Sequence, residues 1–143
     1  MQPIAASTTV KAAAEDAWAA WIDVDGWSEV EIIESARLLE GPFAVGAVIR
    51  SKAKGFPGST LTVTRVEEPR IWVDESRGPG LTMTFDHVIE DLGEELRLTE
   101  SVRIEGALAP IVSRLTRRKL EALFAASVAH VAERARAAGA ARS

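Results

Sequence analysis

Residues 81–104 read LTMTFDHVIEDLGEELRLTESVRI, and this stretch decides the fold. Apolar and polar side chains alternate along two runs, Leu81–Glu90 and Glu94–Ile104, as they do in half-buried β-strands. Only Asp91–Gly93 separates the two runs, so the strands should pair as an antiparallel hairpin. One face of this hairpin carries the large apolar side chains, and we expect that face to meet the core.

The rest of the sheet is predicted from similar short runs nearer the N-terminus. Turn residues such as Gly41-Pro42, Gly55–Gly58 and Gly78–Gly80 separate most of these runs, so neighbouring strands are joined by short connections. The sequence therefore predicts an antiparallel meander with one edge strand before it. The expected strands are Ile4–Val10, Glu31–Leu39, Ala47–Lys54, Ser59–Glu67 and Ile71–Arg77.

Two helices complete the predicted fold. Residues Ala12–Asp23 place apolar side chains, among them Trp18 and Trp21, at helical spacing. A long Ala-rich helix is expected over Pro110–Ala138, with Gly139 as its stop and a frayed tail over 139–143. A helix of that length buries its apolar face by lying across the concave side of the sheet. This packing tends to leave a cavity between helix and sheet, where we expect the functional site.

The composition describes one globular domain, which we place at residues 1–138. The chain has 143 residues, of which 47% are hydrophobic, and this is enough for a single core. Its formal net charge of −4 lacks the basic excess of most nucleic-acid-binding surfaces. It has no cysteine, which excludes a disulfide framework and thiol catalysis.

Signals for targeting and for cofactors are missing from the sequence. The first residues, MQPI, are not a basic region followed by an apolar stretch, and no apolar run approaches the ~18 residues of a membrane span. We therefore expect a soluble cytoplasmic protein. No His and carboxylate residues cluster at metal-ligand spacing, and there is no Gly-rich phosphate loop, so we expect no metal and no cofactor.

Several short motifs carry a resemblance to a known family. They are Ala14–Trp18 (AEDAW), Asp25–Val30 (DGWSEV), Gly41–Gly46 (GPFAVG), Val66–Arg70 (VEEPR) and the final helix. In these motifs the chain resembles the START-like, or SRPBCC, helix-grip superfamily, and in pattern its polyketide cyclase/dehydrase group. The family often has a second tryptophan where Val30 stands here. The resemblance covers nearly the whole chain, and its motifs mark the fold and not a reaction.

The resemblance implies an α+β, Bet v 1-like helix-grip fold. In this fold a curved antiparallel sheet wraps around a long C-terminal helix, and two short helices follow the first strand. The superfamily includes ligand carriers, hormone receptors and aromatase/cyclases, so the resemblance alone does not select a function.

Two ionisable residues share the predicted inner face of the hairpin, His87 and Glu100. With Asp91–Gly93 as the turn, Phe85 should lie across from Glu100 and His87 across from Leu98. His87 and Glu100 are then diagonal neighbours ~7–8 Å apart, or directly opposed if the register shifts by one pair. They are candidates for a catalytic acid–base pair. The alternatives are an internal hydrogen bond between them, a Glu100 that meets water at the rim, and a pair that binds a ligand without catalysis.

Six apolar residues are candidates for ligand contact. The strand Ile71–Arg77 leaves its inner face undecided, because Trp72, Asp74 and Ser76 share one face while Ile71 and Val73 share the other. The candidates are Phe85, Met83, Leu98, Trp72, Phe56 and Phe124.

Three functions remain open from the sequence. The first is binding of a small hydrophobic or aromatic molecule, lipid- or polyketide-like. The second is a cyclase or dehydratase that uses His87 and Glu100. The third is an interaction module, with a homodimer formed through an exposed edge such as Ile4–Val10.

Overall fold

The structure is a computed structural model, which describes residues 3–142. A first strand is followed by two short helices, six further strands and a long helix. The elements are β1 (Ile4–Val10), α1 (Ala14–Ile22), the 3₁₀ helix η1 (Val24–Glu29), β2 (Ile33–Leu38), β3 (Val48–Ala53), β4 (Ser59–Glu67), β5 (Ile71–Gly78), β6 (Leu81–Asp91), β7 (Leu96–Glu105) and α2 (Ala109–Arg142).

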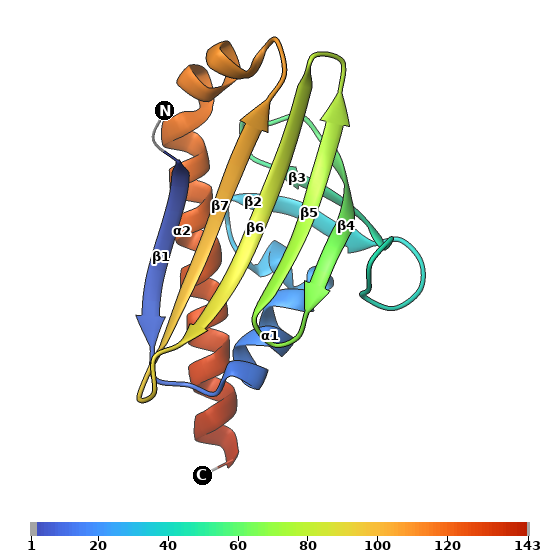
Figure 1. Cartoon of the computed structure of the whole chain (residues 1–143). Helices are drawn as coiled ribbons and strands as arrows, with labels where there is room; N and C mark the ends of the chain where they lie inside the picture. The colour runs from blue at the N-terminus through green and yellow to red at the C-terminus, as the bar shows by residue number, and fades with distance from the viewer. Residues whose placement is uncertain (1–2, 143) are drawn as a thin grey trace.

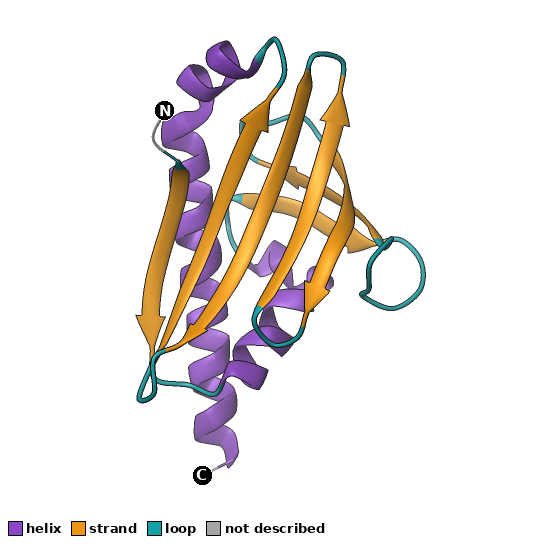
Figure 2. Ribbon diagram, in the orientation of Figure 1, coloured by secondary structure: helices purple, strands orange, loops and turns teal. Residues whose placement is uncertain are grey.

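The seven strands form one antiparallel sheet in the order β1-β7-β6-β5-β4-β3-β2. Figure 1 shows that α2 runs along one side of the curled sheet, while β2 and β3 bend round from the far edge. Helices and strands therefore make two layers, as Figure 2 shows. This confirms the expected helix-grip architecture, with β1 at one edge of the sheet. The homodimer through that edge stays a prediction.

The hydrophobic core lies between the sheet and the helices. Its main cluster joins α1, the sheet and the second half of α2 through the fully buried Trp21, Trp72 and Val128. A smaller cluster joins β1, β7 and the middle of α2. The Trp27 indole donates a hydrogen bond to the Trp21 carbonyl oxygen over 2.8 Å, which holds η1 against α1. Among residues 3–142, no helix is both long enough and apolar enough to cross a membrane.

The C-terminal helix is longer than the sequence predicts. It runs through Gly139 to Arg142, so the expected stop at Gly139 is wrong, while the fraying of the tail stays a prediction. A glycine within a helix costs only about 1 kcal/mol relative to alanine. The Arg142 guanidinium also pairs with the Asp16 carboxylate of α1, which ties the end of α2 to the rest of the molecule. Ser143, the last residue of the expected tail, lies outside the described residues.

Candidate functional site

A cavity of about 350 Å³ lies between the concave face of the sheet and α2. Most of its wall is apolar, and aromatic side chains from both layers contribute to it. The aromatic side chains are Trp21, Trp27, Phe56, Phe85 and Phe124. Helix α2 supplies no ionisable side chain to the wall; it supplies Val112, Thr116, Leu120, Leu123, Phe124 and Ser127.

Strand pairing places three ionisable side chains in this wall. Glu100 on β7 pairs with His87 on β6, and His87 pairs with Trp72 on β5. Two residues along each strand, and on the same face, Phe85 of β6 pairs with Asp74 of β5. The three ionisable residues of the wall, Asp74, His87 and Glu100, are therefore neighbours on one patch of the concave face.

His87 is buried, with 4% of its surface exposed, and its ring is fixed from two sides. The imidazole stacks on the Trp72 indole with 3.5 Å between ring centroids and 3° between planes. Its Nδ1 lies 3.1 Å from the Trp72 carbonyl oxygen. Because a carbonyl only accepts hydrogen bonds, Nδ1 carries the proton in this contact. Burial lowers the pKa of His87 to about 3, so near neutral pH the ring is neutral and Nε2 is a hydrogen-bond acceptor.

Glu100 is the partner that His87 faces across the strand pair. The distance from His87 Nε2 to Glu100 Oε2 is 3.8 Å, which is too long for a direct hydrogen bond. The Ser127 hydroxyl of α2 donates to Glu100 Oε1 over 2.7 Å, and the Trp21 side chain also hydrogen bonds to the carboxyl group. Burial raises the pKa of Glu100 to about 7 in spite of these two hydrogen bonds.

Asp74 is the third ionisable group in the wall and the one that sequence reasoning did not select. Only 2% of its surface is exposed, and its Oδ1 atom has no hydrogen-bond partner in the described part of the chain. Burial raises the pKa of Asp74 well above its ordinary value, and the negative charge of the nearby Glu100 adds a smaller increase. A signal was present: the short turn at Gly78–Gly80 sets Asp74 opposite Phe85, whose inward face was already assigned.

The predicted register of the β6–β7 hairpin is wrong by one pair. Phe85 pairs with Val102 and not with Glu100, and His87 lies directly opposite Glu100 and not Leu98. The reason is that Asp91 still pairs with Leu96, so the connection covers residues 92–95 and lies one residue later in the chain than the connection over 91–94 that the predicted register implies. The Asp91 carboxylate accepts a hydrogen bond from the Gly93 amide, which stabilises the turn at this position. The alternative with His87 and Glu100 directly opposed is the observed one.

The predicted ligand-contact residues divide into two groups. Phe85, Met83, Phe56 and Phe124 lie in the cavity wall, as do His87 and Glu100. Leu98 and Trp72 do not line the cavity; both are fully buried in the main core cluster. Trp72 nevertheless contributes to the site because its ring and carbonyl position His87.

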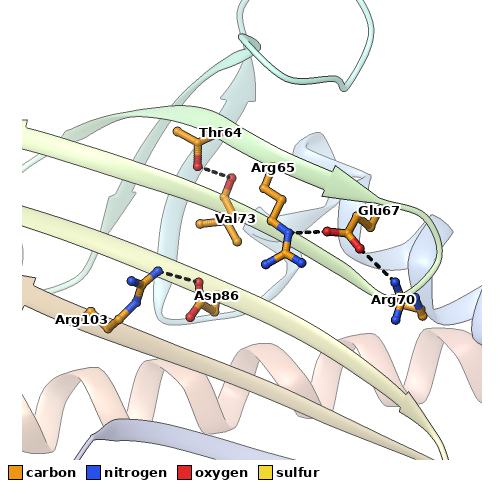
Figure 3. Close-up of polar contacts among 7 residues, drawn as sticks. All are labelled: Thr64, Arg65, Glu67, Arg70, Val73, Asp86 and Arg103. Carbon is orange, nitrogen blue, oxygen red and sulfur yellow. Dashed lines mark hydrogen bonds and ion pairs between the residues drawn. The ribbon is translucent and has the colours of Figure 1, made fainter.

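The outer face of the sheet has different electrostatics. Figure 3 shows that acidic groups there meet arginines: Arg103 contacts Asp86 at 3.3 Å, and Arg70 contacts Glu67 at 2.9 Å. Arg65 also pairs with Glu67. The carboxyl groups of the cavity have no such basic partner among its lining residues. No group of three or more His, Cys, Asp and Glu in residues 3–142 could hold a metal ion.

The curled sheet, the long helix and the cavity between them define a helix-grip fold of the Bet v 1 type. Solved structures of this fold match nearly the whole chain. The Zhui aromatase/cyclase from a Streptomyces species is 21% identical, with a TM-score of 0.67 over 96% of this chain and 98% of that chain. A truncated norcoclaurine synthase from Thalictrum flavum is 13% identical, with a TM-score of 0.73 over 92% and 91%.

The protein Ara h 8 is 17% identical, with a TM-score of 0.67 over 91% of this chain and 97% of that chain. No family model and no curated protein matches the sequence. The likeness therefore establishes the fold, and function must be argued from the cavity.

Proposed function

We propose that the protein binds a small hydrophobic or aromatic molecule, lipid- or polyketide-like in character, in the cavity between the sheet and α2. The observation that supports this best is the cavity itself. Its volume of about 350 Å³ is within the range of small-molecule sites, and its wall combines aromatic rings with a few buried polar groups. The apolar wall would hold the body of the ligand, and the polar groups would orient it.

Intrinsic tryptophan fluorescence tests this proposal, because Trp21 and Trp27 lie in the cavity wall. Titration with naphthalene- and anthracene-based ligands should quench or shift the emission and saturate at one ligand per chain. Phe85→Ala should weaken binding, because this ring lines the cavity. Val88→Ala is the control, since its side chain lies on the same strand and outside the cavity wall. Absence of saturable binding across the panel would contradict the proposal.

A second candidate is a cyclase- or dehydratase-type enzyme with His87 and Glu100 as an acid–base pair. The observation in its favour is the direct opposition of the two side chains, with 3.8 Å between His87 Nε2 and Glu100 Oε2. The pKa of Glu100, about 7, is close to the value that suits proton transfer near neutral pH. A neutral imidazole Nε2 could accept a proton, while a protonated Glu100 could donate one.

Mass spectrometry of incubated polyketide-type substrates separates the two candidates. With chromatographic separation before the mass measurement, a dehydratase should release a product lighter by one water and a cyclase a product of equal mass and changed retention time. In either case His87→Gln should abolish turnover while binding persists. A binding protein should return each ligand unchanged, and His87→Gln should lower its affinity only modestly.

A further inference from the structure

We propose that the preferred ligand is a hydrophobic amine, bound as its ammonium ion by the Asp74 carboxyl group. Asp74 lies with His87 and Glu100 on the concave face of the sheet, which is called the floor of the cavity below. This inference rests on the proposed binding function and adds the chemical class of the ligand to it. The argument proceeds from the partners of Asp74, from the charges in the wall and from its rings.

Asp74 is the acidic group of the cavity that lacks a complete set of partners. Within residues 3–142 its Oδ1 has no hydrogen-bond partner, although only 2% of the residue is exposed. Glu100, by contrast, accepts hydrogen bonds from Ser127 and Trp21. A buried polar atom without a partner carries a cost on the order of 1–3 kcal/mol, which a donor on a bound ligand would remove. Asp74 lines the cavity, so a ligand there can reach it.

The charges of the cavity wall favour a ligand with a positive charge. The lining residues include Asp74, Glu100 and the neutral His87, and no lysine or arginine. An anionic ligand would bring a third acidic group beside two buried carboxyls, with no basic residue to pair with it. An ammonium ion brings three N–H donors to a floor whose free atoms, Asp74 Oδ1 and His87 Nε2, are acceptors.

The rings of the wall suit the rest of such a ligand. Phe85, which pairs with Asp74 across the strands, makes an edge contact with Phe124 of α2 at 6.1 Å between centroids. An aromatic body can pack against these rings while its ammonium group reaches the floor. The faces of nearby aromatic rings also attract a cation once water is excluded.

Binding of this kind has a proton signature. Burial and the nearby Glu100 raise the pKa of Asp74, which favours the protonated carboxyl group more than in an exposed aspartate. An ammonium ion that pairs with the carboxylate must displace that proton, and affinity should rise with pH because a proton is released. Other groups act on the same site: Glu100 faces it from β7, His87 from β6, and Asp86 acts on it from the outer face. Helix α2 adds no titratable group to the wall.

Isothermal titration calorimetry with three isosteric probes tests the proposal. The probes are 2-(2-naphthyl)ethylamine, 2-(2-naphthyl)ethanol and 2-naphthylacetate. We expect the amine to bind about tenfold to a hundredfold more tightly than the alcohol, and the acetate to bind least. Titrations in buffers of different ionisation enthalpy should show release of about one proton for the amine and none for the alcohol.

Asp74→Asn removes the charge with little change of shape. The variant should lose most of the amine preference and the proton release, while its affinity for the alcohol stays within about threefold. Glu90→Gln makes the same kind of chemical change on the adjacent strand β6, at an exposed carboxylate outside the cavity wall, and should leave all three affinities unchanged. Retained binding of the alcohol also demonstrates that the Asp74 variant is folded.

The outcomes separate this inference from the proposed function. If the acetate binds as well as the amine, or if Asp74→Asn keeps the amine preference and its proton release, the ligand class is wrong while the binding function stands. Proton release that persists in Asp74→Asn and disappears in Glu100→Gln would assign the role to Glu100 and overturn the inference for Asp74. If none of the three probes binds, the failure lies with the proposed function itself.

Discussion

The His87 imidazole stacks on the Trp72 indole, and the backbone carbonyl oxygen of the same tryptophan accepts a hydrogen bond from His87 Nδ1. Strand pairing produces both contacts, because His87 and Trp72 are directly opposed on β6 and β5. One residue therefore sets the plane of the imidazole and also its tautomer. The free nitrogen, Nε2, is left to face Glu100.

The first prediction concerns the protonation of this ring. We expect His87 to keep the Nδ1–H tautomer and to stay neutral from pH 8 down to about pH 4, because burial lowers its pKa to about 3. Two-dimensional ¹H–¹⁵N spectra of the imidazole nitrogens report both properties. In Trp72→Phe the carbonyl remains, so the tautomer should persist. An Nε2–H tautomer in the unmodified protein would contradict the assignment.

The second prediction concerns stability against pH. Glu100 has its pKa raised from 4.5 to about 7, so its contribution is fully present below pH 4.5 and is lost as the pH rises to about 7. His87 has its pKa lowered from 6.5 to about 3, so its contribution is present above pH 6.5 and is lost as the pH falls towards 3. The two slopes oppose each other between pH 4.5 and 6.5. For Glu100 the full change is on the order of 3 kcal/mol.

Urea unfolding at pH 4.5, 5.5, 6.5 and 7.5 separates the two contributions. Glu100→Gln should lose stability on acidification more steeply than the unmodified protein, because the opposing slope is removed. His87→Gln should gain stability as the pH falls from 7 to 4.5, and Asp74 adds to this gain because its pKa is also raised. Parallel curves for all three proteins would show that neither pKa is shifted by folding.

The third prediction concerns the hydrogen bond between α2 and the cavity floor. Ser127→Ala removes the donor to Glu100 Oε1 and should raise the pKa of Glu100 further, since this hydrogen bond lowers it. The loss of unfolding free energy should be about 1–2 kcal/mol at pH 8 and smaller at pH 5, where Glu100 is protonated. Ser113→Ala is a useful control on the same helix, because the Ser113 hydroxyl has no hydrogen-bond partner among the residues that the structure describes. A loss that does not change with pH would exclude the ionised carboxylate as the partner.

The fourth prediction compares two phenylalanines of the cavity. Phe124 is fully buried, whereas Phe85 is half-buried and faces the open volume. Phe124→Ala should therefore lower the unfolding free energy by ~3–5 kcal/mol, and Phe85→Ala by clearly less. Ligand affinity should fall with Phe85→Ala. Equal losses of stability would show that the cavity is closed around both rings.

The fifth prediction concerns the end of the sheet near the start of α2. Gly106 has φ of +112°, and a Cβ atom there would collide with the Gly80 backbone carbonyl. Gly106→Ala should cost roughly 1–3 kcal/mol. Gly58 has open space around it and no positive φ, so Gly58→Ala should be nearly neutral. Thermal unfolding of the two variants beside the unmodified protein measures both effects.

The strands of this fold are largely readable from the sequence because alternation and turn residues agree. Leu81–Asp91 alternates over its whole length, and its inner face was predicted correctly. The strand Ile71–Gly78 resisted the same reasoning because both of its faces are covered: Trp72 and Val73 are buried on opposite sides. Alternation cannot distinguish two buried faces, so the inward position of Asp74 was not predicted.

The remaining differences arise from contacts distant in sequence. The end of α2 depends on Arg142 meeting Asp16, which no local pattern encodes. The position of Leu98 and Trp72 outside the cavity wall likewise depends on how α1 packs beneath the sheet. The cavity is a property of the assembled layers, and the sequence predicts only the inward faces from which it is built.

The pairing of β1 with β7 also determines when the site can form during synthesis. Ile4 pairs with Val102, so the first strand leaves the ribosome long before its partner has been made. Contacts of such long range slow folding, and the unpaired strand presents a free edge until β7 arrives. Helix α2 follows β7 in the chain and closes the cavity last. A nascent chain therefore has no ligand site until α2 has emerged.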